Sequence, residues 1–312
     1  MKHPACADNP PMLVISRQQL IGLSILTLLW GVNWPVMKLG VTGFPPLSFR
    51  MLSMWLGLPV MALSLYLLKA PFAIARAHWR ELGWLAVFNM FIWHSLIIIA
   101  VRHLSSGRAA ILGYTMPIFA ALLGAWLFQQ RLSARAWAGV AAAGAGVLLL
   151  LWHEIFELAG RPLGVLLALL SALGWAFGVH LMRRTRIPVP TLTLSFWMTV
   201  LAAVFLTVLA LLFERDQWHW PAAQNAYAIA FNALLIFGLA QTLWLSLARH
   251  LPPVASTLSV MLIPVIGVLG GALWLGESLH WQDLIAVLLL VAAIASVLWP
   301  SSPATASASR SS

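Results

Sequence analysis

Charged residues are scarce in this chain. Asp, Glu, Lys and Arg make up only 8% of its 312 residues, whereas 62% are hydrophobic. Soluble globular proteins carry about 25% charged residues, so this chain has too little polar surface to cover a water-soluble globule of its length. The composition therefore excludes an ordinary soluble protein and predicts a polytopic membrane protein.

Cysteine and catalytic motifs are also lacking. The single cysteine, Cys6, excludes an intrachain disulfide and a cysteine-based metal cluster. The chain has no His-Glu-x-x-His, Gly-x-Ser-x-Gly or Gly-x-x-x-x-Gly-Lys-Ser/Thr sequence. We therefore expect no metal and no other cofactor. A membrane-embedded enzyme and a nucleotide-driven pump are disfavoured, whereas a membrane channel stays open as the alternative to a transporter.

Long hydrophobic runs are abundant. A bilayer core needs about 20 apolar residues per helix, and the charges, Pro-Pro pairs and Gly clusters of this chain separate ten such runs. The runs do not alternate as the strands of a membrane β-barrel would. The sequence predicts an all-α integral membrane protein with ten transmembrane helices, near 19–39, 44–68, 81–101, 107–128, 134–151, 162–182, 191–213, 224–248, 254–275 and 281–299.

Lysine and arginine predict the orientation. If the N-terminus is cytoplasmic, twelve of the eighteen basic residues fall on the inner side, as the positive-inside rule requires. Both termini are then cytoplasmic, with 1–18 as an N-terminal segment and 300–312 as a disordered tail. The net charge of +10 needs no nucleic-acid partner. The expected partners are the lipid bilayer and a small-molecule substrate, for a monomer or a homodimer.

The chain contains an internal repeat. Residues 102–132 and 249–279, offset by 147, share eight identities in 31 positions without a gap. Both stretches open on Arg-His-Leu, and both carry a proline at the same place, Pro117 and Pro264. Because five helices per half is an odd number, the second half must enter the membrane from the opposite side. We predict two inverted five-helix repeats, 19–151 and 162–299, around a shared central site.

The sequence resembles the drug/metabolite transporter superfamily, in its EamA-like branch. The resemblance is carried by Trp30-Gly31-Val32-Asn33 with Lys38, Pro45-Pro46 with Arg50, Ser106 to Pro117, Pro264, and the Gly276-Glu277 turn, which reads Gln129-Gln130 in the first half. It implies a carrier of the bacterial inner membrane that moves small metabolites, commonly amino acids and related compounds, outward by alternating access of a central cavity. It does not identify the substrate.

Polar side chains at membrane depth are costly unless they are paired or face a wet cavity. Asn232 and Ser259 belong to this group, and the candidates we select from it for the substrate cavity are Asn33, Asn89, His94, Tyr114, His180 and Gln241. His94 and Gln241 occupy equivalent repeat positions. Each candidate has an alternative role as a bond to a neighbouring helix, and a core histidine satisfied by a carbonyl is an ordinary outcome.

Aromatic and basic residues extend the candidate cavity. Trp30, Trp93, Trp175 and Trp244 lie deeper than the interfacial tryptophans and are candidates for its apolar lining, with helix packing or lipid contact as the alternative. For Arg50 three roles are open: snorkelling, capping of carbonyls near Pro35, or binding the carboxylate or phosphate of a substrate. For Lys38, snorkelling toward the headgroups is favoured.

Two further features bear on mechanism. Pro117 and Pro264 are predicted hinges, since a proline inside a helix removes a backbone hydrogen bond. None of the eight acidic residues lies in the middle of a predicted helix, so the usual intramembrane carboxylate for proton or sodium coupling is missing. We therefore expect a facilitator or exchanger, or a carrier with weak histidine-linked proton coupling.

Overall fold

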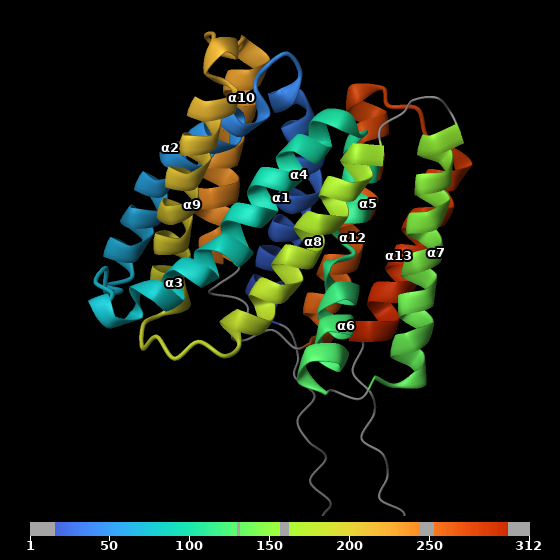
Figure 1. Cartoon of the computed structure of the whole chain (residues 1–312), viewed down its shortest axis with the longest axis horizontal. Coiled ribbons are helices and arrows are strands. Elements are labelled where there is room, and N and C mark those ends of the chain that lie inside the picture. The colour runs from blue at the N-terminus through green and yellow to red at the C-terminus, as the bar shows by residue number, and fades with distance from the viewer. Residues whose placement is uncertain (1–15, 130–131, 157–161, 244–252, 299–312) are drawn as a thin grey trace, which may run out of the picture.

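The computed structural model describes residues 16–129, 132–156, 162–243 and 253–298, and in these ranges every regular element is helical (Figure 1). The first half comprises α1 (Arg17–Val41), α2 (Pro46–Leu67), α3 (Trp79–Ala86), α4 (Ile92–His103), α5 (Ser106–Gly113), α6 (Met116–Phe128) and α7 (Ala134–Phe156). The second half comprises α8 (Pro162–Met182), α9 (Thr191–Phe213), α10 (Ala223–Phe231), α12 (Pro253–Leu275) and α13 (Trp281–Leu298). The prediction of an all-α chain is confirmed over these residues. The predicted N-terminal segment, the C-terminal tail and Trp244 lie outside them.

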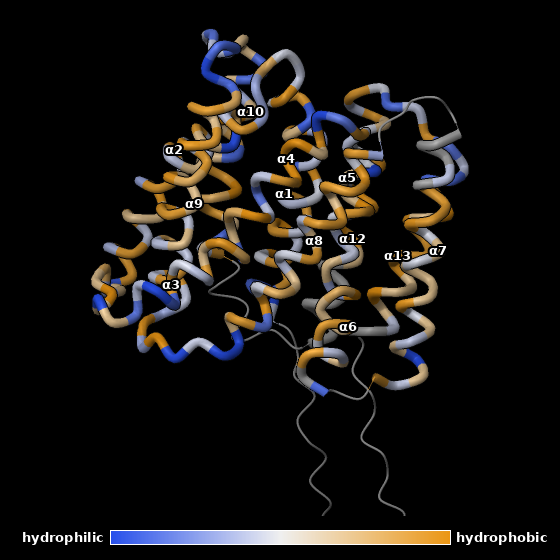
Figure 2. Tube along the Cα trace, in the orientation of Figure 1, coloured by the Kyte–Doolittle hydropathy of each residue, from blue (hydrophilic) through white to orange (hydrophobic). Residues whose placement is uncertain are grey.

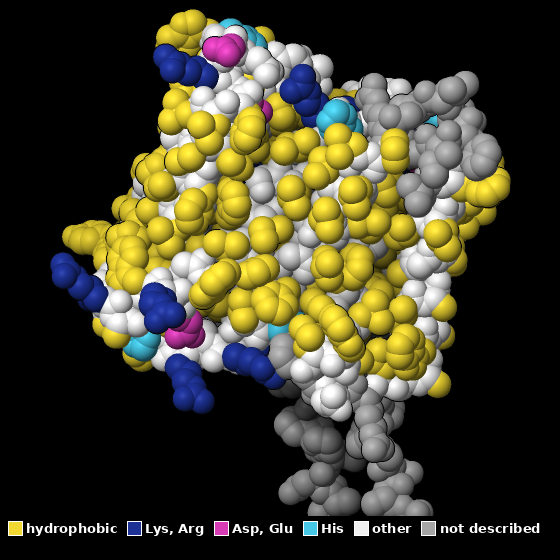
Figure 3. All heavy atoms as spheres, in the orientation of Figure 1, with side chains coloured by type: hydrophobic (Ala, Val, Ile, Leu, Met, Phe, Trp, Pro, Cys, Tyr) yellow, Lys and Arg dark blue, Asp and Glu magenta, His cyan; other side chains and the backbone are white. Residues whose placement is uncertain are grey.

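The helices have the length and composition of membrane-spanning segments. Seven described helical stretches are long and apolar enough to cross a bilayer, and three shorter apolar helices accompany them, 134–150, 261–275 and 281–296. Hydrophobic residues fill the middle of the bundle, and hydrophilic residues gather at its two ends (Figure 2). On the face in Figure 3, Lys, Arg, Asp and Glu leave a wide hydrophobic band free. The chain is a multi-pass membrane protein.

The two halves interlock instead of lying apart. Helix α1 packs on α12, α4 on α8, and α2 on both α9 and the helix that begins with α10. Glycine allows the close contact of α2 with the helix that begins with α10. A Cβ on Gly57 of α2 would fall 2.7 Å from the Phe237 side chain and 2.9 Å from the Ala233 carbonyl oxygen. The boundary between the halves therefore runs through the centre of the bundle. Helices α7 and α13 pair at one edge (Figure 1).

Two helices carry π-helical segments at equivalent repeat positions. Residues Val87–Phe91 join α3 to α4, and residues Asn232–Ala240 continue α10. At the offset of 147, the first segment falls inside the second. The next residues also correspond: the Ser95 hydroxyl donates to the Phe91 carbonyl at 2.7 Å, and the Thr242 hydroxyl donates to the Gly238 carbonyl at 2.9 Å. The sequence repeat thus has a counterpart in local backbone structure.

The two repeat prolines differ in their surroundings. Pro117 stands in the first turn of α6, directly after a break at Tyr114 and Thr115 that separates α6 from α5. A proline costs little there, because the first amides of a helix have no partner within it. Pro264 lies inside α12, which runs through it without a break. The tertiary structure therefore distinguishes two positions that the sequence makes equivalent.

Candidate functional site

A buried arginine lies between the two halves. Arg50, the fifth residue of α2, is 1% exposed. Its Nη1 donates to Asn232 Oδ1 at 3.3 Å, and its Nη2 contacts Met37 Sδ at 2.7 Å. The guanidinium carbon also lies 5.8 Å from the ring centroids of both Phe49 and Phe237. All these partners are neutral, and a thioether is only a weak acceptor.

Three polar atoms of α1, α2 and α4 are buried without a hydrogen-bond partner. They are Arg50 Nε, His94 Nδ1 and Asn33 Oδ1. His94 faces the same ring as the guanidinium, with centroids 5.2 Å from those of Phe237. Asn33 lies four residues before Met37 on α1 and so shares its face. Each buried polar atom without a partner lowers the stability of the fold by about 1–3 kcal/mol. We call Arg50, His94 and Asn33 the central cluster, and its cost in stability points to a functional role.

Among the side chains that the structure describes, no carboxylate reaches the central cluster. Glu81, Glu214, Glu277 and Asp283 lie near helix ends, and each accepts hydrogen bonds there from other groups. Asp216 lies in the exposed turn that follows α9. Within the described part of the chain, the buried guanidinium is therefore stabilised by neutral groups and aromatic faces alone.

Aromatic side chains gather around the break between α5 and α6. The rings of Trp34 and Tyr114 meet edge to face at 6.1 Å, and those of Trp93 and Trp175 are 6.5 Å apart. Both Trp34 and Trp93 approach Gly113, where an added Cβ would fall 2.8 and 3.3 Å from them. Trp30 packs against the same core from α1. Sequence analysis selected four of these five residues and missed Trp34, which follows Asn33 directly.

Other predicted site residues have structural partners. The Asn89 amide donates to the Leu85 carbonyl of its own helix at 3.0 Å and packs against Gly178. The His180 Nε2 lies 2.8 Å from the Ala120 carbonyl of α6, the ordinary outcome for a core histidine. Gln241 is half-buried directly after the π-helical segment. The structure thus brings Arg50 and His94 together at the Phe237 ring, places Asn33 one helical turn before Met37, and binds Asn89 and His180 to backbone.

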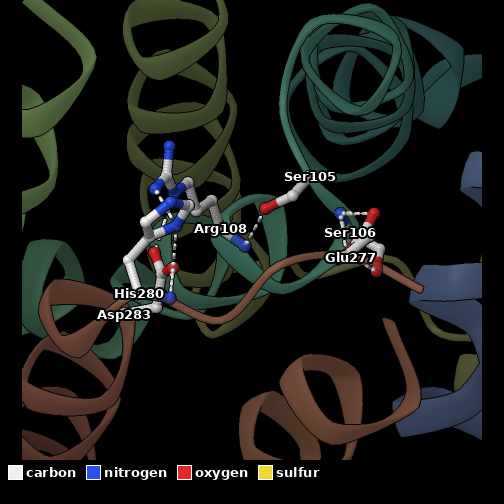
Figure 4. A network of polar contacts seen from close by, with 6 residues as sticks. All are labelled: Ser105, Ser106, Arg108, Glu277, His280 and Asp283. Carbon is white, nitrogen blue, oxygen red and sulfur yellow. Dashed lines mark hydrogen bonds and ion pairs between the residues drawn. The ribbon is translucent and has the colours of Figure 1, made fainter. Parts of the chain in front are cut away.

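Polar contacts also join the halves at the end of the bundle where α1 ends and α2 begins, upper in Figure 1. Arg108 Nε of α5 donates to Asp283 Oδ1 of α13 at 2.7 Å, and Arg108 Nη2 lies 3.3 Å from His280 Nδ1. Beside them, the Glu277 carboxylate accepts from the Ser106 amide at 2.8 Å and from its hydroxyl at 2.7 Å (Figure 4). Both contacts link the first half to the second.

Helix ends supply further contacts at this upper end. The Glu214 carboxylate accepts from the Leu47 and Ser48 amides at 2.9 and 2.7 Å, and so caps the N-terminus of α2 with negative charge. The Asn225 amide nitrogen lies 3.0–3.1 Å from three carbonyls at the end of α1. Lys38 donates to the carbonyls of residues 101, 102 and 104 at the end of α4. Protein carbonyls therefore bind the Lys38 ammonium, in place of the favoured contact with headgroups.

Comparison with known proteins identifies the family. The model of the EamA-like transporter family matches this chain twice, at residues 19–152 and 162–299. The two matches together span most of the chain. The chain belongs to the EamA-like transporter family.

Relatives of this EamA-like protein are named as transporters. This chain is 23% identical to the uncharacterized transporter YoaV of Bacillus subtilis, over 88% of this chain and 94% of YoaV. It is 27% identical to the uncharacterized inner membrane transporter YedA of Escherichia coli, over 91% and 93% of the two chains. A second Escherichia coli protein, named "Probable amino-acid metabolite efflux pump", is 25% identical over 89% and 93%. The chain is a membrane transporter and not an enzyme.

A solved crystal structure supports the fold. It covers 91% of this chain and 98% of its own, with a TM-score of 0.63 and 21% sequence identity. At that identity, the likeness speaks for the arrangement of helices alone.

The surface cavities of this EamA-like protein lie at the upper end. One of about 280 Å³ is bordered by Lys38, Arg108, Glu277 and His280, and another of about 440 Å³ by residues of α2, α4 and α9. Neither lining includes Arg50, His94 or Asn33. Arg50 is only 1% exposed, so in this conformation protein covers the guanidinium.

Proposed function

We propose that this protein is a secondary transporter that moves a small metabolite, an amino acid or a related compound, out of the cell by alternating access. The observation that carries the proposal is the central cluster. Arg50 and His94 of the first half meet Asn232 and Phe237 of the second inside a largely hydrophobic bundle. Ionisable groups inside membrane proteins mark substrate and ion pathways because they are expensive to keep there.

The proposed architecture is ten transmembrane helices in two inverted repeats. Its support is that the family model matches twice and that the π-helical segments recur at the repeat offset. The relative direction of helices α5 and α12 supports the inverted arrangement of the two repeats as well. Ser106 begins α5, whereas Gly271 lies near the end of α12, and a Cβ on Gly271 would meet the Ser106 hydroxyl. This contact between the start of one helix and the end of its repeat counterpart supports opposite directions for the two, as inverted repeats require.

The proposed orientation places the upper end outside the cell. At the opposite end lie Lys69, Arg76, Arg80 and Arg135, together with Arg183, Arg184 and Arg186 of the segment after α8. The positive-inside rule assigns that end to the cytoplasm. Since α1 begins there and α13 ends there, both termini would be cytoplasmic. The name of the YedA relative supports the bacterial inner membrane as the location.

Alternating access would use the polar contacts between the halves as an outer gate. In this conformation Arg108–Asp283 and Ser106–Glu277 join the halves on the proposed outer side. At the opposite end, Glu81 accepts from the Thr185 hydroxyl at 2.7 Å, and the Trp197 indole donates to the Phe72 carbonyl at 2.6 Å. Opening outward would break the first set of contacts.

Counterflow in vesicles tests the function. Purified protein would be reconstituted with an unlabelled amino acid inside, and labelled amino acid would be added outside at low concentration. A carrier exchanges the two and accumulates label transiently, whereas a channel only equilibrates it. A panel that includes polyamines and nucleosides guards against the wrong substrate class. Continuous conductance without counterflow for any compound would favour the channel and refute the proposal.

A further inference from the structure

We propose that Arg50 binds the carboxylate of the transported substrate, with His94 and Asn33 completing the polar part of the site. The inference rests on the proposed transport function and adds a substrate class to it: monocarboxylates, amino acids among them. The names of the relatives given above say nothing about this arginine or its neighbours.

The two arginines that are buried in the described part of the chain have different surroundings. Arg108, 8% exposed, is paired with the Asp283 carboxylate at 2.7 Å. Arg50, 1% exposed, has an amide oxygen at 3.3 Å, a sulfur atom, and two aromatic rings. A buried charge is ordinarily paired, because desolvation costs several kcal/mol. What Arg50 lacks among the described residues is the anion that Arg108 has.

Two of the three free atoms of the cluster, Arg50 Nε and His94 Nδ1, are nitrogens that can donate to a carboxylate, whereas Asn33 Oδ1 can accept from a donor elsewhere on the substrate, such as an amino group. A guanidinium binds a carboxylate through two parallel N–H bonds, and one side of its fork is formed by Nε with an Nη. Arg50 Nε is buried and without a partner, and so is Nδ1 of His94, which faces the same Phe237 ring. A single cation balances one negative charge. A phosphate, with nearly two charges, would leave the site short of positive charge.

The surroundings suit a carboxylate attached to an apolar group. Phe237 lies between Arg50 and His94, and Trp93, the neighbour of His94 on α4, packs beside Trp175. The carboxylate would face α2, and the rest of the ligand would lie toward α4 and α8. Because Arg50 belongs to the first half and Asn232 to the second, a carboxylate that displaced the amide would alter a contact between the halves.

Matched acids and amides test the inference in full-length protein in detergent. The probes are leucine, phenylalanine, glutamine and benzoate, each beside its carboxamide, which keeps the shape and loses the negative charge. We expect the acids to raise the apparent melting temperature and the amides to leave it unchanged. Arg50→Gln should weaken the binding of the acids by about 30-fold or more, and Arg50→Lys should weaken it by less. Equal shifts by acid and amide, shifts by neither, or a preference for phosphate monoesters would overturn the inference.

Stability without ligand separates a binding role from a structural one. If the role of Arg50 is to bind a substrate anion, its buried charge has no charged partner in the unliganded protein. Arg50→Met removes that charge and should leave the melting temperature of the unliganded protein unchanged or raised. Arg108→Met is the matched control and should lower it, because the buried Asp283 carboxylate loses its guanidinium partner. A comparable loss of stability in both variants would make Arg50 structural and refute the inference. Counterflow of uncharged compounds by the wild type would refute the inference while preserving the transporter, whereas counterflow of nothing would remove both.

Discussion

Arg108 and Asp283 form a buried ion pair, Nε to Oδ1 at 2.7 Å, between residues 175 positions apart in the chain. Arg108 opens the fourth predicted helix and Asp283 opens the last, so the pair joins the first half to the second. In the proposed orientation it lies on the outer side. The same contact that stabilises this conformation would therefore have to break for the protein to open outward.

Removing one member of this pair should destabilise the protein. Breaking a buried ion pair from one side costs about 3–5 kcal/mol, because the remaining charge has no partner. Asp283→Leu and Arg108→Met should therefore each lower the melting temperature in detergent, and the double variant Arg108→Met/Asp283→Leu should recover much of the loss. If the double variant were as unstable as the sum of the two single variants, the pair would not be coupled.

Gly271 should not tolerate a side chain. A Cβ at this position would overlap both the Glu277 carboxylate and the Ser106 hydroxyl, which bond each other. We expect Gly271→Ala to separate them and to shift the protein toward outward opening. In a Cys6→Ser background with cysteine at position 105, labelling by an impermeant maleimide should speed up. Gly144→Ala, where the structure shows open space, is the control, and equal labelling in both variants would contradict the gate.

The two repeat prolines should both affect transport, by different routes. Pro264 interrupts the backbone bonding of a continuous α12, so Pro264→Ala should stiffen the helix and slow transport. Pro117 stands after an existing break, so Pro117→Ala should favour fusion of α5 and α6. Counterflow rates of folded variants measure both effects. Wild-type rates, with an unchanged conformational equilibrium, would remove the hinge role.

Transport should not depend steeply on sodium. Every carboxylate whose side chain the structure describes lies near a helix end, and those of Glu81, Glu214, Glu277 and Asp283 already accept hydrogen bonds. A coupling sodium ion would need oxygen ligands at depth, and carboxylates are the usual anionic ones. Uptake into vesicles with and without an inward sodium gradient checks this. Strong sodium-driven accumulation would show that coupling uses other oxygen atoms.

Much of the central cluster was within reach of the sequence. Asn33, Arg50 and His94 are polar residues in apolar runs, and the cost of placing such groups in a membrane singles them out. Met37 and Phe237 carry no such mark, because a sulfur atom or a ring in an apolar helix is indistinguishable from core packing. Trp34 was missed although it lies in the same predicted helix as Trp30. Asn89 and His180 were selected by the same rule as Arg50, and only their bonds to nearby carbonyls set them apart.

The upper contacts were out of reach for a different reason. Glu214, Glu277 and Asp283 fall in or beside predicted loops, where an acidic residue is ordinarily solvated. Pairing them with Leu47, Ser106 and Arg108 requires knowing which helix ends meet, and those partners are at least 166 residues away.

The sequence alone determined the class of the molecule. Scarce charge, hydrophobic runs of helix length and a repeat at a constant offset are properties of the chain itself. They can be recognised without knowing which residues meet in space. The tertiary structure decided which polar residues meet: it gave Arg108 a carboxylate, gave Lys38 the end of α4, and left Arg50 among neutral groups. Those outcomes depend on the packing of helices far apart in the chain, and packing is a property of pairs of surfaces that no single helix carries.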